Sequence, residues 1–315
     1  MGIFDKRTNY KPFEYPEVLQ FTDAIHKTFW VHGEINFTAD VQDYHTRLTP
    51  VEKEVVKRSM LGISQVEVAV KSFWGDLYKL FPKPEMNGLG STLAHNEFIH
   101  SESYSHILTI LGLEREFENL ITVPVFRKKL EVIEKHLTNN TDVVGKLLFF
   151  TLIIENTSLF GHFANVLSLT RFKGVMKNIS NIIAYTSVDE ALHSNVGIYL
   201  INKIREEGHT IDEDYIKNAC LEYIKYEEEL LDWIYEEGEL TFFSKTNMIN
   251  FMKYRMDEAL VKCGVEKIFN ITSAEYSPMK WFDEEVFSNA LDDFFCKRPT
   301  DYTKHDKPID ANDLF

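Results

Sequence analysis

Four glutamates and two histidines are the side chains of this sequence whose types and spacing could do chemistry. In chain order they are Glu67, Glu97 with His100, Glu155, and Glu190 with His193. In each Glu-x-x-His pair both side chains lie on one face of a helix, close enough to bind a common centre. Each pair also follows a lone glutamate, after 30 residues in the first half and 35 in the second. One such pair arises by chance in many helices, but this doubled pattern is a strong signal.

The two lone glutamates lie in apolar surroundings. Glu67 shares a helical stripe with Met60, Ile63 and Trp74, and Glu155 directly follows the run LLFFTLII. An ionised carboxylate is costly there unless it is paired or bound to a metal ion. A glutamate from each of two helices and a Glu-x-x-His pair from each of two others form the ligand set of a dimetal-carboxylate centre. We therefore predict a dimetal site, in which four carboxylates balance the charge of two divalent ions.

The donor types narrow the choice of metal. Oxygen-rich ligands with only two imidazoles favour iron or manganese over a structural zinc ion. Taken singly, each glutamate is more often a solvated helix residue, so the prediction rests on all six positions together. His162 follows Glu155 by seven residues and lies about 10 Å further along the axis, too far to bind the same ion. We interpret it as a structural residue or a support for the ligands. His45, His95 and His106 fall outside the pattern.

Long helices must position these ligands, and the sequence predicts an all-α protein. Thr49 can cap a helix that begins at Pro50, and Glu52 completes a capping box. Periodic apolar patterns predict helices over 16–31, 50–81, 85–112, 117–137, 142–171, 175–207, 212–237 and 241–263. Four helices of about 30 residues would each be about 45 Å long, which suits a large helix bundle. No Gly/Ser linker divides the chain, so we predict one helical domain over 1–296 and a flexible tail over 297–315.

Charge and composition exclude several classes of partner. The chain has 34 Lys and Arg against 49 Asp and Glu, a net charge of −15, which argues against nucleic acid and anionic membranes. The most apolar run, 147–154, is too short to span a bilayer, and the N-terminus does not read as a signal peptide. The three cysteines, Cys220, Cys263 and Cys296, form no close pair. These features predict a reduced, cytoplasmic setting.

The motifs resemble the small (β, radical-generating) subunit of class I ribonucleotide reductase. Those that carry the resemblance are Thr-Phe-Trp30, Glu97-x-x-His100-x-x-x-Tyr104 and Asp189-Glu190-Ala-Leu-His193, and it covers about residues 15–302. The resemblance implies a ferritin-like fold, a homodimer, an intracellular location and a large catalytic subunit as partner. It implies that the metal site stores a one-electron oxidant. Proton-coupled electron transfer then passes it to a cysteine of the large subunit, for reduction of ribonucleotides to deoxyribonucleotides.

The resemblance also assigns roles to single residues. It implies that the metal ligands are Glu67, Glu97, His100, Glu155, Glu190 and His193. Tyr104 matches the radical-forming tyrosine, while Trp30 and Asp189 match the start of the electron-transfer path, where Asp189 also orients a ligating imidazole. Tyr302 is the only tyrosine of the tail and matches a relay across the subunit interface, and the tail's acidic and apolar end suits docking on the large subunit. On the residues alone, Trp30 and Tyr104 also fit ordinary core positions.

Two residues depart from the common pattern of this family and indicate a subclass. Many family members have Asp at the first ligand position, where this chain has Glu67, and Lys71 follows one helical turn later. Together they resemble the dimanganese subclass that works without a tyrosyl radical. We hypothesise two Mn ions, with a Mn(III)/Mn(IV) oxidant and Tyr104 unoxidised. Lys71 would then place a positive charge beside an oxidant channel that draws in an anion such as superoxide; the alternative for it is an ordinary helix ion pair.

The same residues are compatible with other interpretations. Within the family, two Fe ions, two Mn ions or a mixed Mn/Fe pair could work with a radical on Tyr104. Outside it, the same ligands suit a ferritin-type iron-storage protein, which would leave Trp30, Asp189 and the tail unexplained. A dimetal oxygenase, oxidase or desaturase would need an apolar substrate channel and no reductase partner.

Overall fold

The computed structural model describes residues 2–137 and 142–286, apart from the side chains of residues 69–71. Every regular element in these ranges is helical, which confirms the predicted all-α class. The α-helices are α1 (Val18–Lys27), α2 (Thr38–Thr46), α3 (Pro50–Gly75), α4 (Leu77–Leu80), α5 (Pro84–Leu111), α6 (Glu114–Asn119), α7 (Pro124–Leu137), α8 (Val143–Phe149), α9 (Leu159–Lys173), α10 (Lys177–Glu206), α11 (Glu213–Ile234), α12 (Lys245–Lys262) and α13 (Ser273–Tyr276). Short 3₁₀ turns are η1 (His32–Glu34), η2 (Leu120–Thr122) and η4 (Ser277–Met279), and a π-helical segment, η3 (Phe150–Ser158), joins α8 to α9.

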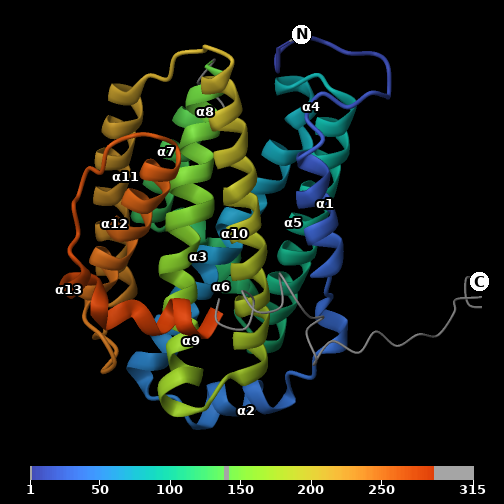
Figure 1. Cartoon of the computed structure of the whole chain (residues 1–315). Helices are drawn as coiled ribbons and strands as arrows, with labels where there is room; N and C mark the ends of the chain where they lie inside the picture. Colours follow the sequence, from blue (N-terminus) through green and yellow to red (C-terminus); the bar gives the residue numbers. More distant parts are fainter. Residues whose placement is uncertain (1, 138–141, 287–315) are drawn as a thin grey trace, which may run out of the picture.

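Long helices run side by side through the molecule (Figure 1). Helix α3 packs along α5 and α9, and α10 packs along η3 and α9. Helix α1 covers α5, while α11 and α12 cover the other side of the bundle, against α7 and η3 respectively. The ligand-bearing helices α3, α5, η3 and α10 are therefore internal to the fold. The predicted boundary between residues 296 and 297 and the tail that follows it lie outside the described residues.

Helix α3 begins as the sequence predicts but ends earlier. The Thr49 hydroxyl accepts from the Glu52 N–H at 3.3 Å, and the Glu52 carboxylate accepts from the Thr49 N–H at 2.8 Å, which completes the capping box. The helix was expected to reach residue 81 but ends at Gly75, and α4 follows. Helix α5 packs closely at this break, since a Cβ on Gly90 would lie 2.7 Å from the Trp74 carbonyl oxygen. Local periodicity does not encode that approach.

The predicted helix over 142–171 exists but is not uniform. Asp142 caps its start by accepting from the N–H groups of Val144 and Gly145 at 3.1 and 2.8 Å. Between α8 and α9 the backbone adopts π-helical geometry, which is rare and frequently found at functional sites. The whole stretch Val143–Lys173 is long and apolar enough to cross a membrane, but 83% of its most apolar window is buried inside the bundle. It is a core helix of this fold.

Helix α2 was not predicted. It has nine residues and little apolar periodicity, so local pattern gives no signal for it. Its buried Asp40 accepts from the backbone N–H groups of Asn178 and Ile179 at 2.8 and 3.0 Å, at the N-terminus of α10. A carboxylate at this position satisfies otherwise unpaired N–H groups and complements the helix dipole. Tertiary contact therefore holds α2 in place.

Gly197 allows α10 to approach the π-helical segment, and replacing it should destabilise the protein. A Cβ at this position would lie 1.9 Å from Thr151 Oγ1. We expect Gly197→Ala to lower the free energy of unfolding by about 1–3 kcal/mol, the usual cost of overpacking. Gly88→Ala in α5 is the matched control, because its added Cβ would meet no atom within 4 Å beyond its own stretch of helix, among the residues that the structure describes. The control should raise stability by about 0.5–1 kcal/mol, measured by chemical denaturation.

Candidate metal centre

The structure brings all six predicted ligands together in the core. Glu67 comes from α3, Glu97 and His100 from α5, Glu155 from η3, and Glu190 and His193 from α10. Each side chain is at most 1% exposed. Two overlapping groups of ligand atoms result, in which all atoms lie within 4.8 Å of one another. The first comprises Glu67, Glu97, His100 and Glu190, and the second Glu97, Glu155, Glu190 and His193.

Two glutamates belong to both groups. Glu97 and Glu190 lie between the two positions, so each can bridge a pair of ions. The first position adds Glu67 and His100, and the second adds Glu155 and His193. We call these the His100 position and the His193 position. Two such groups that share carboxylates are the arrangement of a dimetal-carboxylate centre.

The ligand atoms converge at ion-pair distances but make almost no hydrogen bonds of normal geometry. His100 Nδ1 lies 3.1 Å from Glu190 Oε1 and 3.3 Å from Glu97 Oε2, and His193 Nδ1 lies 2.9 Å from Glu97 Oε1. Within the described residues, neither nitrogen makes a hydrogen bond, and neither does any carboxylate oxygen of the four glutamates except Oε1 of Glu155. Buried polar atoms are normally paired. So many buried ligand atoms without hydrogen bonds, gathered at two adjacent positions, fit two bound metal ions.

The pKa shifts of the cluster show how it is neutralised without metal. Burial raises the pKa of the Glu67 carboxyl well above its usual range, and the nearby Glu97 raises it further. Burial and the neighbouring Glu190 raise the pKa of Glu155 in the same way. Burial alone would lower the pKa of His100, but Asp189, Glu190 and Glu97 outweigh it and raise that pKa. Metal binding at such a site releases protons, so we infer that affinity rises with pH.

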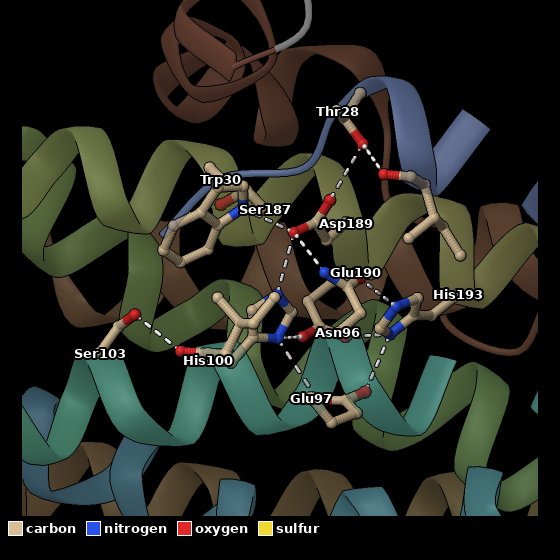
Figure 2. A network of polar contacts seen from close by, with 12 residues as sticks. Thr28, Trp30, Asn96, Glu97, His100, Ser103, Ser187, Asp189, Glu190 and His193 are labelled. Carbon is tan, nitrogen blue, oxygen red and sulfur yellow. Dashed lines mark hydrogen bonds and ion pairs between the residues drawn. The ribbon is translucent and has the colours of Figure 1, made fainter. Parts of the chain in front are cut away.

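Asp189 is the centre of a hydrogen-bond network outside the ligands (Figure 2). Its Oδ2 accepts from Trp30 Nε1 at 2.8 Å and Asn96 Nδ2 at 3.1 Å, and lies 3.0 Å from His100 Nε2. The Trp30 ring stacks on the His100 ring, with centroids 5.8 Å apart and planes 16° apart. The sequence predicts that Trp30 and Asp189 lie beside the metal ligands and that Asp189 orients a ligating imidazole. The carboxylate fixes the His100 tautomer, which leaves Nδ1 free to bind a metal ion.

Two supporting residues were not predicted. Asn96 accepts from His193 Nε2 at 2.8 Å, and Trp74 donates its indole N–H to Glu155 Oε1 at 3.0 Å. Both are buried. Asn96 directly precedes a predicted ligand, and Trp74 shares a helical stripe with another, so adjacency to ligands was the available signal. Which atom each side chain would reach depended on helix packing.

Of the remaining predicted site residues, the structure describes the side chain of Tyr104 only. Tyr104 lies on α5 one helical turn after His100, is fully buried, and has a hydroxyl without a hydrogen-bond partner among the described residues. Burial and the charge of Glu67 raise its pKa. The side chain of Lys71, and all of Tyr302, lie outside the described residues.

His162 takes no part in either ligand group. It is buried where α9 meets α3, and a Cβ on Gly62 would lie 2.7 Å from its ring. Burial and the nearby Lys129 charge lower its pKa, so it packs as a neutral ring.

Trp74→Phe tests the bond to Glu155. The substitution keeps an aromatic ring but leaves Glu155 Oε1 buried without a donor. We expect the metal-free protein to lose about 1–3 kcal/mol of stability beyond the cost of the smaller ring. Trp281→Phe measures the cost of the smaller ring alone, because the buried Trp281 N–H has no hydrogen-bond partner in the described part of the chain. Equal losses in the two variants, measured by denaturant titration, would contradict the assignment.

Fold and site together define a dimetal-carboxylate protein of ferritin-like architecture. The model of the family "Ribonucleotide reductase, small chain" matches residues 7–278, so the chain belongs to that family. A probable ribonucleoside-diphosphate reductase small subunit of Invertebrate iridescent virus 3 is 23% identical, over 95% of this chain and 85% of that protein. Small subunits of this family supply the oxidising equivalent for ribonucleotide reduction. The family match favours this role over iron storage and oxygenase chemistry.

Two solved structures share the fold. Dimanganese(II)-NrdF of Streptococcus sanguinis superimposes with a TM-score of 0.76 at 18% identity, covering 88% of this chain and 98% of that one. The Rnr4 homodimer of Saccharomyces cerevisiae gives a TM-score of 0.73 at 19% identity, covering 89% of this chain and 90% of that one.

Proposed function

We propose that this chain is a dimanganese small subunit whose oxidised metal pair, rather than a tyrosyl radical, is the stored oxidant. The convergence of four glutamates and two histidines on two adjacent positions supports the metal pair. Glutamate at the first ligand position, Glu67, and the similarity to a dimanganese protein support manganese. The Tyr104 hydroxyl makes no hydrogen bond of normal geometry within the described residues, and the side chain that interacts with it is the neutral Thr186 hydroxyl rather than a metal-ligating carboxylate. When bound and oxidised by an external oxidant such as superoxide, the two ions would supply the one-electron oxidant.

The protein's own residues carry the transfer path. Asp189 orients His100 and accepts the Trp30 indole N–H on the same oxygen, Oδ2. An electron that leaves the indole can therefore be accompanied by movement of the Nε1 proton toward Asp189 over a 2.8 Å hydrogen bond. Burial of Trp30 excludes water from this bond.

The proposed function requires protein partners. We expect a homodimer, as in the similar yeast Rnr4 structure, and a large catalytic subunit that receives the tail over residues 297–315 with Tyr302 as relay. The net charge of −15 argues against nucleic acid and anionic membranes as partners. Two buried free thiols, Cys220 and Cys263, fit a reduced cytoplasmic setting.

Tyr104→Phe distinguishes the metal oxidant from a tyrosyl radical. Removal of an unpaired hydroxyl leaves no polar group unsatisfied, so folding should be unaffected. We expect reductase activity with the large subunit to change by less than about 1 kcal/mol in activation free energy. Low-temperature EPR of the Mn-loaded, oxidised protein should show a coupled multiline signal that tracks activity. A narrow organic signal that disappears together with activity in this variant would place the radical on Tyr104, with two Fe, two Mn or a mixed Mn/Fe pair.

A further inference from the structure

The two ligating imidazoles have different partners behind them. His100 Nε2 lies 3.0 Å from a carboxylate oxygen, Asp189 Oδ2, whereas His193 Nε2 lies 2.8 Å from an amide oxygen, Asn96 Oδ1 (Figure 2). A carboxylate behind a metal-bound imidazole raises its basicity more than a neutral acceptor does, because it stabilises positive charge on the ring. The His100 position therefore has the stronger imidazole donor.

The orientation of the Asn96 amide is fixed by its second bond. Its Nδ2 lies 3.1 Å from Asp189 Oδ2, and only the NH₂ end can donate to that carboxylate. The oxygen must then face His193, whose Nε2 must carry the proton. Asn96 is 3% exposed, so water does not compete for either bond. One buried amide thus sets the tautomer of His193 and links it to the acceptor that His100 uses.

Glu67 and Glu155, the two glutamates that belong to only one ligand group each, also make the His100 position the stronger one. At the His193 position, Glu155 Oε1 already accepts the Trp74 N–H at 3.0 Å. At the His100 position, neither oxygen of Glu67 makes a hydrogen bond within the described part of the chain. A hydrogen bond from N–H withdraws electron density from a carboxylate, so Glu155 is the weaker donor. The two bridging glutamates are common to both positions and cannot offset these differences.

We propose that Asn96 is a positioning residue that, by giving His193 a neutral partner, makes the two metal positions unequal. The His100 position binds the first divalent ion, and the His193 position binds the second, more weakly. This inference rests on the dimetal site of the proposed function but not on the nature of the oxidant. The stronger position also shares Asp189 with Trp30, so it lies on the side of the transfer path.

Exchanging the two partners tests the proposal directly. The double variant Asn96→Asp with Asp189→Asn keeps the total charge and the number of hydrogen-bonding groups but moves the carboxylate from His100 to His193. Crystals given less than one equivalent of Mn(II) would reveal the preferred position by anomalous scattering. We expect wild-type protein to fill the His100 position first, and the double variant to fill the His193 position first. Equal filling in wild-type protein, or an unchanged order in the double variant, would overturn the proposal.

The single variant Asp189→Asn gives both histidines neutral partners. Mn(II) titration followed by EPR should show two unequal binding steps in wild-type protein, and the tighter step should weaken by about 10–100-fold in this variant. Circular dichroism establishes that each variant is folded. These measurements need neither the large subunit nor an oxidant, so they stand if the metal-only oxidant fails. Wild-type protein that binds no Mn(II) would overturn the metal site itself, and this inference with it.

Discussion

Trp30→Phe is expected to abolish reductase activity while leaving metal binding intact. Phenylalanine keeps an aromatic ring against His100 but removes the N–H that bonds to Asp189 at 2.8 Å, and it is much harder to oxidise than an indole. We expect activity with the large subunit to fall by at least about 1000-fold, equivalent to about 4 kcal/mol. No ligand atom changes, so the variant should still bind two Mn(II) ions. Activity is measured as deoxyribonucleotide formation, and metal content by elemental analysis.

A second tryptophan provides the control for this result. Trp233 lies on α11, where its ring contacts Phe126 and Arg58 away from the metal centre. Trp233→Phe should therefore retain activity. If Trp30→Phe kept its activity, or lost it together with its metal ions, the transfer role of Trp30 would be wrong.

Glu190→Gln is expected to prevent the metal pair from assembling. Glu190 belongs to both ligand groups, and the amide removes one of the four negative charges that balance two divalent ions. Burial raises the pKa of Glu190, but the neighbouring Glu155 carboxyl and the positive charge of His193 outweigh burial and lower it. Loss of a hydrogen-bond partner behind a ligand lowers metal affinity by about 10–100-fold. Loss of the ligand Glu190 itself should lower metal affinity further. We expect at most one bound Mn(II) per chain and no measurable reductase activity.

The same helix offers a matched control. Glu206 lies at the exposed end of α10, where it pairs with Lys203 at 2.8 Å. Glu206→Gln removes the same charge, but an exposed pair contributes little to stability and lies far along the helix from the ligands. This variant should bind two ions. Two ions retained in Glu190→Gln would show that Glu190 does not bridge them.

The sequence by itself determined the helical class and the set of six candidate ligands. A helix converts a spacing of three residues into a shared face, so Glu97 with His100 and Glu190 with His193 could be paired without a structure. The cost of burying a charge marked Glu67 and Glu155, because both lie among apolar residues. Capping chemistry likewise placed the start of α3 at Thr49. All of these are local properties of the chain.

Only the tertiary structure decided how the ligands are supported. Asn96 reaches His193 and Asp189 on α10, and Trp74 on α3 reaches Glu155 on η3, across helix pairs whose relative height and rotation no local period encodes. The π-helical geometry around Glu155 and the contact between Asp40 and the start of α10 are equally non-local. Spacing within a helix fixes which side chains share a face. Packing between helices fixes which atoms they meet, and that second step makes the two metal positions unequal.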